Sequence, residues 1–585
     1  RKICCLANTG FLFVCTMMSI ATCLNAKVVL LVMVATLAEA RRIPHQQSVP
    51  DDTRRIFSSL FGGTGQKRVT PTKSLTSLLL AFDPASAFSS FGRPKLHTQG
   101  LHAQRPAYRL SRGVCLGTTG NSTESGDAEP PAVKVFPCND KLDKTIFDQA
   151  LPASLNLLVL PMQGLVDLFF IGMLGNEIIL AGQGAANQVY TTAGLLSSTL
   201  PGVTLPLVAR AYAAGNQQDV QKQVGGALFL SGIMGALITL LVGVGNSHWL
   251  RAVGTRPQTL LFALPYLMYR LPGVIPDTVS TVSASSLQGA LDTKSPLKVS
   301  ILALVTNAIF NYLLIFKCGM GIAGAALATA LSQFVAGATY FNILLRRKLV
   351  TWLTALRPPS QEMCSRLAGS VGALQVRNIA LNAAFVVITR QVQGLDTTGI
   401  AAAAHNVAIQ VWLVGGVFLL ALGIIANSLT SAELGRPGST PKSARGVAKR
   451  LLAWGGLLGG GLTVAQCALA KPLIALFSPS AEVQAAAFAP LVVGALLQVI
   501  NGIVFVGEGL MIAGGAYSLL AAGQVVATVL HFLALKAAPP TLTSLWMCFW
   551  VWNFARFGSF LLFWFTKSPL SPDARPGFWM KDKAA

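Results

Sequence analysis

Long apolar segments separated by short polar breaks occupy the chain from about residue 146 onward. A helix of about 20 apolar residues crosses the ~30 Å hydrocarbon core of a bilayer, and each of these segments reaches that length. Several contain proline, as at Pro206 and Pro272, so we expect tilted or kinked helices there. The pattern predicts twelve membrane-spanning helices, at about 146–174, 178–212, 222–245, 257–290, 296–317, 321–346, 362–392, 398–434, 446–470, 481–513, 515–537 and 543–567.

The apolar segments repeat between the two halves of the chain. PYLMYRLPG (265–273) corresponds to PLVVGALLQ (490–498), and LAGQGAANQVY (180–190) corresponds to IAAAAHNVAIQVW (400–412). Six predicted helices separate the copies, so both copies run in the same direction through the membrane. We therefore expect two parallel six-helix lobes, an architecture typical of alternating-access transporters. A duplicated scaffold without transport is the alternative.

Lysine and arginine concentrate in the breaks that follow even-numbered segments, most densely at 346–348 and 436–450. By the positive-inside rule, these breaks and both ends of the helical region face the cytoplasm or the plastid stroma. The predicted division of the chain is a largely disordered leader at 1–140, an N-terminal lobe at 141–346, a basic linker at 347–361, a C-terminal lobe at 362–567 and a polar tail at 568–585.

The composition narrows the class of protein further. Of the 585 residues 52% are hydrophobic and only 11% are charged, whereas a soluble domain has about 25% charged residues. The net charge of +23 does not indicate a nucleic-acid partner, because the basic residues lie in the leader and in the short breaks. The chain has no phosphate-binding loop, no nucleophile elbow and no His or Cys pair at metal-ligand spacing. We expect no enzymatic activity, no cofactor and no metal.

The leader has the features of targeting sequences. An apolar stretch at 11–38 ends in Ala-Glu-Ala before Arg41 and Arg42, as at a signal-peptide cleavage site. Residues 41–123 are rich in Arg, Ser and Thr and poor in acids, a composition typical of transit peptides. PASAFSSFGRP (84–94) resembles the cleavage motif of plastid proteins in algae with secondary plastids. We predict a plastid membrane, with the vacuolar or plasma membrane as alternatives.

Five stretches of the chain carry a family resemblance. They are ALPASLNLLVLPMQGLVDLFFIGMLGNEIILAG (150–182), SLQGALDTKSPL (286–297), VTNAIFNYLLIFKCGMGIAGAALATALSQ (305–333), AAAAHNVAIQVW (401–412) and NSLTSAEL (427–434). Together they resemble the multidrug and toxic compound extrusion (MATE) transporters, in which V-D-x-x-F-x-G-x-L-G recurs in the first helix. The last two stretches are most similar to the DinF-type branch, which includes plastid proteins.

The resemblance implies a fold and a function. The fold is two six-helix lobes around a central cleft. The function is export of small organic compounds by antiport with H⁺ or Na⁺, by what we expect to be a monomer in the lipid bilayer. A flippase for lipid-linked precursors, in the same superfamily, is the alternative. Few Arg and Lys residues lie at mid-membrane positions, and Asp167 is retained, which favours the exporter.

Asp167 lies in the middle of the first apolar segment. A charged residue there costs roughly 2.5–3.5 kcal/mol on insertion scales, and an intramembrane carboxylate is a functional candidate. The resemblance implies a part in cation coupling; a structural hydrogen bond to a neighbouring helix is the alternative. Asn307 and Asn311, four residues apart, share a helix face, so both amides can point into the same lobe and could hydrogen-bond Asp167. The family pattern N-x-x-x-D has lost its acid at Asn311.

A second acid, Asp277, follows Pro272 and Pro276 in the fourth segment, and we place it in the middle of a helix. It could replace the carboxylate that is missing at Asn311. The alternatives are a salt bridge with Arg270, two turns earlier, and a position in a solvated cleft.

The C-terminal half has its own polar set of substrate or cleft candidates: Arg377, His405, Gln410, Trp412 and Glu508. Arg377 would favour an anionic ligand or neutralise Glu508, which stands where DinF-type sequences have Asp. His405 could titrate near neutral pH or simply pack in its alanine-rich helix. The seventh segment has no acid away from its rim, so the acidic pair of sodium-coupled relatives lacks a counterpart. This favours protons as the coupling ion.

Overall fold

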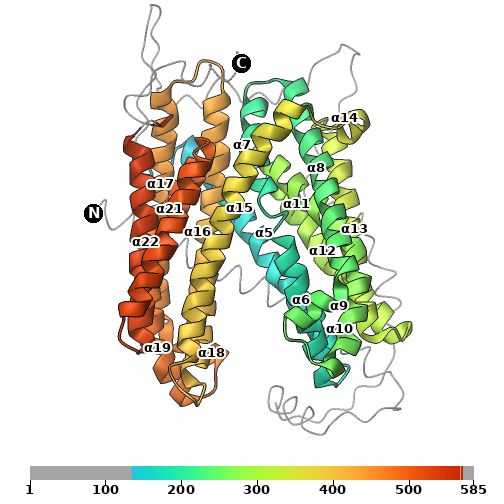
Figure 1. Cartoon of the computed structure of the whole chain (residues 1–585). Coiled ribbons are helices and arrows are strands. Elements are labelled where there is room, and N and C mark those ends of the chain that lie inside the picture. Colours follow the sequence, from blue (N-terminus) through green and yellow to red (C-terminus); the bar gives the residue numbers. More distant parts are fainter. Residues whose placement is uncertain (1–134, 567, 571–585) are drawn as a thin grey trace, which may run out of the picture. The chain divides into compact units, whose positions relative to one another are not determined.

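The computed structural model describes residues 135–566 and 568–570. Nearly all of the predicted leader, and the tail from residue 571, lie outside the described residues. The described part of the chain folds into helices joined by short turns, and it contains no strand (Figure 1). This confirms the all-α fold class.

Every predicted segment of the N-terminal half is helical, and one short helix, α9, lies in the break between the predicted segments 222–245 and 257–290. The helices are α5 (Lys141–Gly172), α6 (Glu177–Gly194), α7 (Leu200–Ala213), α8 (Gln217–Val244), α9 (Asn246–Ala252), α10 (Pro257–Arg270), η1 (Leu271–Gly273), α11 (Val274–Gly289), α12 (Lys294–Tyr312), η2 (Leu313–Lys317) and α13 (Gly321–Arg346). A short helix, α14 (Trp352–Leu356), lies within the predicted basic linker.

The C-terminal half has the same order of helices. They are α15 (Gln361–Gln393), α16 (Ile400–Gly435), α17 (Pro441–Ala468), α18 (Ala470–Phe477), α19 (Ala481–Leu496), α20 (Gln498–Ala513), α21 (Tyr517–Ala537) and α22 (Leu542–Phe565).

Eight described helices are long and apolar enough to cross a membrane unbroken, and α19 with α20 forms a ninth span bent by 47°. The other three predicted segments correspond to α6 with α7, α10 with α11, and α22. The first two of these are interrupted, as expected from prolines that remove a backbone donor and clash with the preceding turn. The twelve predicted segments are therefore all helical.

The internal repeat is visible in the lengths of matched helices. Helices α8 and α17 both have 28 residues and begin at positions 217 and 441, and α11 and α20 both have 16 residues and begin at 274 and 498. One matched pair differs. The second span of the N-terminal lobe breaks between α6 and α7, whereas α16 continues without interruption for 36 residues.

Within each lobe, the helices pack closely along small residues. In the C-terminal lobe the backbones of α17 and α20 touch at Gly455 and Gly502, where an added Cβ on either residue would overlap the other backbone. Glycine at such crossings lets two helices approach closely and gain van der Waals contact. This contact matters in a membrane because the hydrophobic effect contributes little to the association of helices there. The polar residues of the spans are held in place by this packing.

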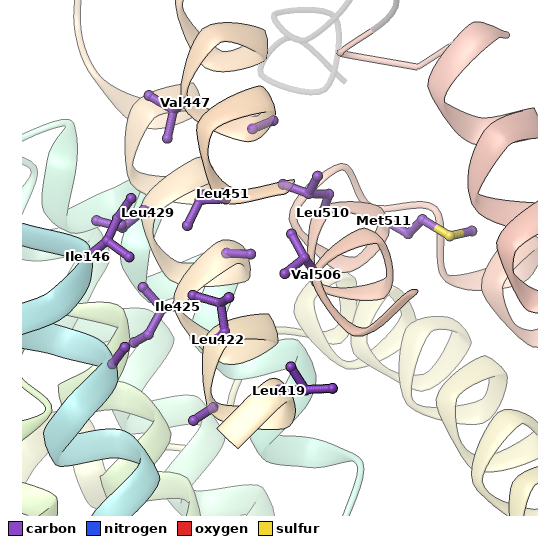
Figure 2. Packing of buried hydrophobic residues seen from close by; sticks show 14 of the residues in the cluster. Ile146, Leu419, Leu422, Ile425, Leu429, Val447, Leu451, Val506, Leu510 and Met511 are labelled. Atoms are coloured by element: carbon purple, nitrogen blue, oxygen red, sulfur yellow. The ribbon is translucent and has the colours of Figure 1, made fainter. Parts of the chain in front are cut away.

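The two lobes contact each other through α5 and α7 of the first and α16 of the second. Figure 2 shows part of the apolar cluster involved: Ile146 of α5 faces Leu429 and Ile425 of α16, and α17 and α20 complete the cluster. At the same interface Gly435 lies against the backbone of Arg210, where a larger residue would not fit.

Candidate functional site

Asp167 is 3% exposed and points from α5 to α12 and α13. One carboxylate oxygen, Oδ1, accepts hydrogen bonds from Nδ2 of Asn311 at 2.8 Å and from Nδ2 of Asn307 at 3.0 Å. The other, Oδ2, accepts from Oγ1 of Thr329 at 2.9 Å. Three uncharged donors on two helices therefore surround one buried carboxylate.

The local structure of α12 positions the two amides. Asn307 and Asn311 are one turn apart on the face turned to α5, and Nδ2 of Asn311 also donates to the backbone oxygen of Asn307 at 3.1 Å. Directly after Tyr312 the helix widens into the π-turn η2. Such widenings occur often at functional sites because they shift the register of one helix face.

Arg270 and Asp277 belong to a second polar cluster in the same lobe. Nη1 of Arg270 donates to Oδ1 of Asn187 at 2.9 Å and to the hydroxyl of Tyr266 at 2.8 Å, and its guanidinium lies 4.3 Å from the ring centre of Tyr190. The Tyr190 hydroxyl donates to Oδ2 of Asp277 at 3.4 Å. Tyr190 thus mediates between the cation and the acid.

This arrangement differs from the sequence interpretation of Asp277 in two ways. The residue lies in the first turn of α11, not in the middle of a helix, because η1 interrupts the span at Pro272. In the described part of the chain, no ion pair joins it directly to Arg270; the stacked Tyr190 ring takes the place of that salt bridge. Asp277 and Tyr190 line a small pocket with Ser197, in keeping with the solvated alternative.

Glu508 of α20 lies between two arginines. Its Oε1 accepts hydrogen bonds from Nη2 and Nε of Arg556 at 2.7 and 3.0 Å, and its Oε2 accepts from Nη2 of Arg377. The Arg556 side chain is 3% exposed and that of Arg377 is 16% exposed. Of the two roles considered for Arg377, neutralising Glu508 is present in the structure.

The remaining predicted cleft residues do not join Glu508. His405 and Trp412 lie in an aromatic cluster, in which Nε1 of Trp546 donates to Nδ1 of His405 at 3.2 Å and the Trp412 and Phe549 ring centres are 5.5 Å apart. Gln410, on the other side of α16, is exposed. The structure therefore divides the five predicted residues into an ionic pair, an aromatic pair and an isolated amide.

Residues 152–313 match the sequence model of the MatE family. The chain carries a MATE family domain. Over 422 residues, 69% of this chain and 79% of the relative, it is 28% identical to Protein DETOXIFICATION 44, chloroplastic, of Arabidopsis thaliana. It is 27% identical to DNA damage-inducible protein F of Escherichia coli over 255 residues, 42% of this chain and 54% of that protein.

A solved MATE structure shows the same fold. The Vibrio cholerae MATE transporter VcmN in its bent form superposes with a TM-score of 0.65 at 21% identity, covering 72% of this chain and 95% of that one. The prediction of a MATE protein with two parallel six-helix lobes is thereby confirmed. The chain is an integral membrane protein that carries a MATE domain, the domain of multidrug and toxic compound efflux transporters.

Two polar residues of this MATE fold escaped the sequence analysis. Thr329 lies in a run of small residues, and only its spacing of one turn from Gln333 distinguishes its helix face. Arg556 lies alone in the aromatic sequence WNFARF, and an intramembrane arginine is itself a signal that a partner acid must exist. Both could have been found by asking which helix supplies a partner to Asp167 and to Glu508.

One group of side chains in the described part of this MATE protein has the spacing of metal ligands. One ligand atom each from Cys138, Asp140 and Asp143 lies within 4.8 Å of the others. Arg450 of α17 already provides positive charge there, since it donates to Oδ2 of Asp143 at 2.7 Å and to Oδ2 of Asp140 at 3.0 Å. Although partial burial raises the pKa of Asp140, the Asp143 amide and the Arg450 charge bring it below the usual value. We interpret the group as an ionic contact between the lobes.

Proposed function

We propose that this protein exports small organic compounds in exchange for protons, with Asp167 as the residue that binds and releases the proton. The observation that carries the proposal is the environment of that carboxylate: it is buried inside the N-terminal lobe, and its hydrogen bonds from described residues come from three uncharged donors, Asn307, Asn311 and Thr329. The charge of Arg270, in the second cluster, acts on it without a direct bond. A buried carboxylate that is bonded to no cation loses a large desolvation cost when it is protonated.

The hydrogen bonds around Asp167 can accommodate both protonation states without moving heavy atoms. In the ionised state, Thr329 donates its hydroxyl proton to Oδ2. The same hydroxyl lies 3.1 Å from the backbone oxygen of Ala325 and can donate to that oxygen instead. It can then accept a hydrogen bond from the neutral carboxyl group, since a hydroxyl is both donor and acceptor. A proton can therefore arrive and leave while both carboxylate oxygens of Asp167 keep a hydrogen-bond partner.

Protons suit this environment better than sodium does. A hard cation such as sodium requires several oxygen ligands. The two amides turn Nδ2 toward the carboxylate, so both would have to reverse before their oxygens could reach a sodium ion. The carboxylate missing at Asn311 also leaves one negative charge for the ion instead of two.

Coupling follows if the two protonation states favour different conformations of the lobe. A ligand shifts an equilibrium only by its difference in affinity for the two states. We propose that the N-terminal lobe adopts a closed, tightly packed conformation when Asp167 is neutral. When Asp167 is ionised, it keeps its bonds to the amide donors, and the lobe stays open and hydrated.

The test uses the full chain in liposomes with an imposed pH gradient. Wild type should move ethidium or carboxyfluorescein against its concentration gradient, with a matching proton flux, and an imposed sodium gradient alone should have no effect. Asp167→Asn should abolish the proton-driven movement. Asp148→Asn, on the exposed surface of the same helix, is the matched control and should behave as wild type. Proton-driven transport at a normal rate in Asp167→Asn would refute the assignment.

We also propose that the protein resides in a plastid membrane, with the predicted leader at 1–140 as its targeting segment. The acid-poor sequence of 41–123 and the likeness to a relative named as chloroplastic support this location. A fluorescent protein fused behind residues 1–140 should enter the plastid. Its retention along the secretory route would favour the vacuolar or plasma membrane instead.

A further inference from the structure

One ionic group inside the C-terminal lobe has more positive than negative charges. Arg377 and Arg556 lie well inside their helices, α15 and α22, and they share a single carboxylate, Glu508. Among the described residues, these three side chains form one ionic group with a formal charge of +1. A surplus charge in the low-dielectric interior of a membrane protein is costly unless an anion or water meets it.

Arg556 accounts for the neutralisation of Glu508. Two of its nitrogens donate to Oε1 of Glu508, and Nη1 donates to Oδ1 of Asn553 at 3.1 Å. Its guanidinium lies 4.6 Å from the ring centre of Trp552, so that ring covers it. Arg556 is therefore fully engaged and nearly inaccessible.

Arg377 provides the surplus charge. It donates one hydrogen bond to Oε2 of Glu508 and one, at 3.0 Å, to Oδ1 of the adjacent Asn378. Its Nε is buried and has no hydrogen-bond partner. A guanidinium has five N–H donors in a planar fork that matches a carboxylate or phosphate group. Donors of Arg377 thus remain for a further acceptor.

The position of Arg377 is next to the interface between the lobes. Nδ2 of its neighbour Asn378 donates to Oγ of Ser198 at 3.3 Å, and Ser198 lies in the break between α6 and α7 of the N-terminal lobe. Asn378 is half-buried, and Asn382, one turn further along α15, is exposed. A compound that moves between the lobes would meet this polar face of α15.

We propose that Arg377 is the specificity-determining residue of the C-terminal lobe, and that it selects small organic anions by pairing with their carboxylate or phosphate group. The inference rests on the proposed export function, since it names the class of compound that is exported. Glu508 and Arg556 hold the Arg377 side chain in place, and their own charges cancel.

The experiment measures binding and transport separately for three probes of similar size: benzoate, benzylamine and benzyl alcohol. By calorimetry on the detergent-solubilised full chain, benzoate should bind at least about tenfold more tightly than benzyl alcohol, as expected for a charge-assisted pair. Arg377→Gln should remove that preference and leave the weak binding of benzyl alcohol unchanged. Arg377→Lys should keep part of the preference, because the charge remains and the planar fork does not.

The control is Arg366→Gln, one of the exposed arginines of α15, which pairs with Glu362 at the end of the helix and should bind benzoate as wild type does. Arg377→Gln leaves the Glu508–Arg556 pair intact, and gel filtration with unchanged helical content would establish that it folds. If wild type binds benzoate no better than benzyl alcohol, or Arg377→Gln keeps the preference, the inference is overturned.

Two further outcomes separate this inference from the proposed function. Benzoate binding that depends on Arg377, without proton-driven transport of any probe, would support the anion site and refute the exporter. Proton-driven transport of benzylamine but not of benzoate would support the exporter and refute the anion site. Binding is repeated in vesicles of phosphatidylcholine with and without phosphatidylglycerol. Loss of benzoate binding only with phosphatidylglycerol would show that a lipid headgroup is the occupant, which overturns the proposal of a soluble anion.

Discussion

Asp167 and Glu508 are both buried carboxylates of membrane-spanning helices, and their surroundings are opposite. Asp167 meets two amides and a hydroxyl, whereas Glu508 meets two guanidinium groups. Uncharged donors stabilise the ionised carboxylate moderately, and they are also compatible with the protonated carboxyl group. Two fixed positive charges strongly favour the ionised form. Burial alone therefore does not identify a proton carrier; the charge of the partners does.

The same contrast distinguishes the arginines of the two lobes. Arg270 of the N-terminal lobe bonds Asn187 and Tyr266 and stacks on Tyr190, so it is held by uncharged groups. Arg556 of the C-terminal lobe is bonded directly to an acid. The N-terminal lobe thus keeps its charges apart behind polar rings and amides, and the C-terminal lobe pairs them. The first arrangement suits a change of charge during transport, and the second suits a fixed electrostatic surface.

The largest effect on stability should come from Glu508→Gln. This change leaves two neighbouring guanidinium groups without their carboxylate, and breaking a buried ion pair typically costs about 3–5 kcal/mol. Thermal unfolding of the purified protein in detergent should show a clearly lower midpoint than wild type. Glu508→Asp, which keeps the charge, should recover part of the loss. An unchanged midpoint for Glu508→Gln would mean that the ionic group does not support the lobe.

Asp167→Asn should show the reverse profile: proton-driven transport is lost, at least about a hundredfold, and stability changes little. The amide cannot carry a proton, but it can still bond Thr329 and the two asparagines. Thermal unfolding and liposome transport measured on the same preparation check this prediction. A destabilisation as large as that of Glu508→Gln would show that Asp167 has a structural role, and the two carboxylates would no longer contrast.

Thr329→Val should have an intermediate effect. It removes the single donor to Oδ2 of Asp167 and keeps the side-chain volume, and a hydrogen bond to a charged group is worth about 1.5–3 kcal/mol. We expect roughly tenfold slower proton-driven transport and an altered dependence on the imposed pH gradient. Thr329→Ser restores the hydroxyl and should restore the rate. Equal rates for valine and threonine would exclude the hydroxyl relay proposed for the two protonation states.

Asp277→Asn should have the smallest effect on coupling. Asp277 bonds the Tyr190 hydroxyl and Gln333, and it bonds none of the donors around Asp167, so the Asp167 cluster remains complete without its charge. Transport should stay within about threefold of wild type, the equivalent of less than 1 kcal/mol. Tyr190→Phe is the matched variant, because it removes the same hydrogen bond from the other side. Loss of coupling in Asp277→Asn would show instead that this acid replaces the one missing at Asn311.

The sequence by itself determined the number and order of the apolar helical spans, though not the short helices α9, α14 and α18 between them. Hydrophobic length and periodicity are local properties, and the repeat that matches α8 to α17 and α11 to α20 can be found by aligning the two halves. The pairing of Asp167 with Asn307 and Asn311 was also predicted, since i and i+4 residues share a helix face and an intramembrane acid needs donors.

Only the tertiary structure decided which polar residues meet across helices. It brought Thr329 to Asp167 and Arg556 to Glu508, and it separated His405 and Gln410 from the ionic group. These outcomes depend on the rotation of each helix about its axis and on its neighbours. Both are set by long-range packing of small and apolar side chains, as where Gly455 meets Gly502. Helical periodicity identifies the residues that share a face but not the helix that the face contacts.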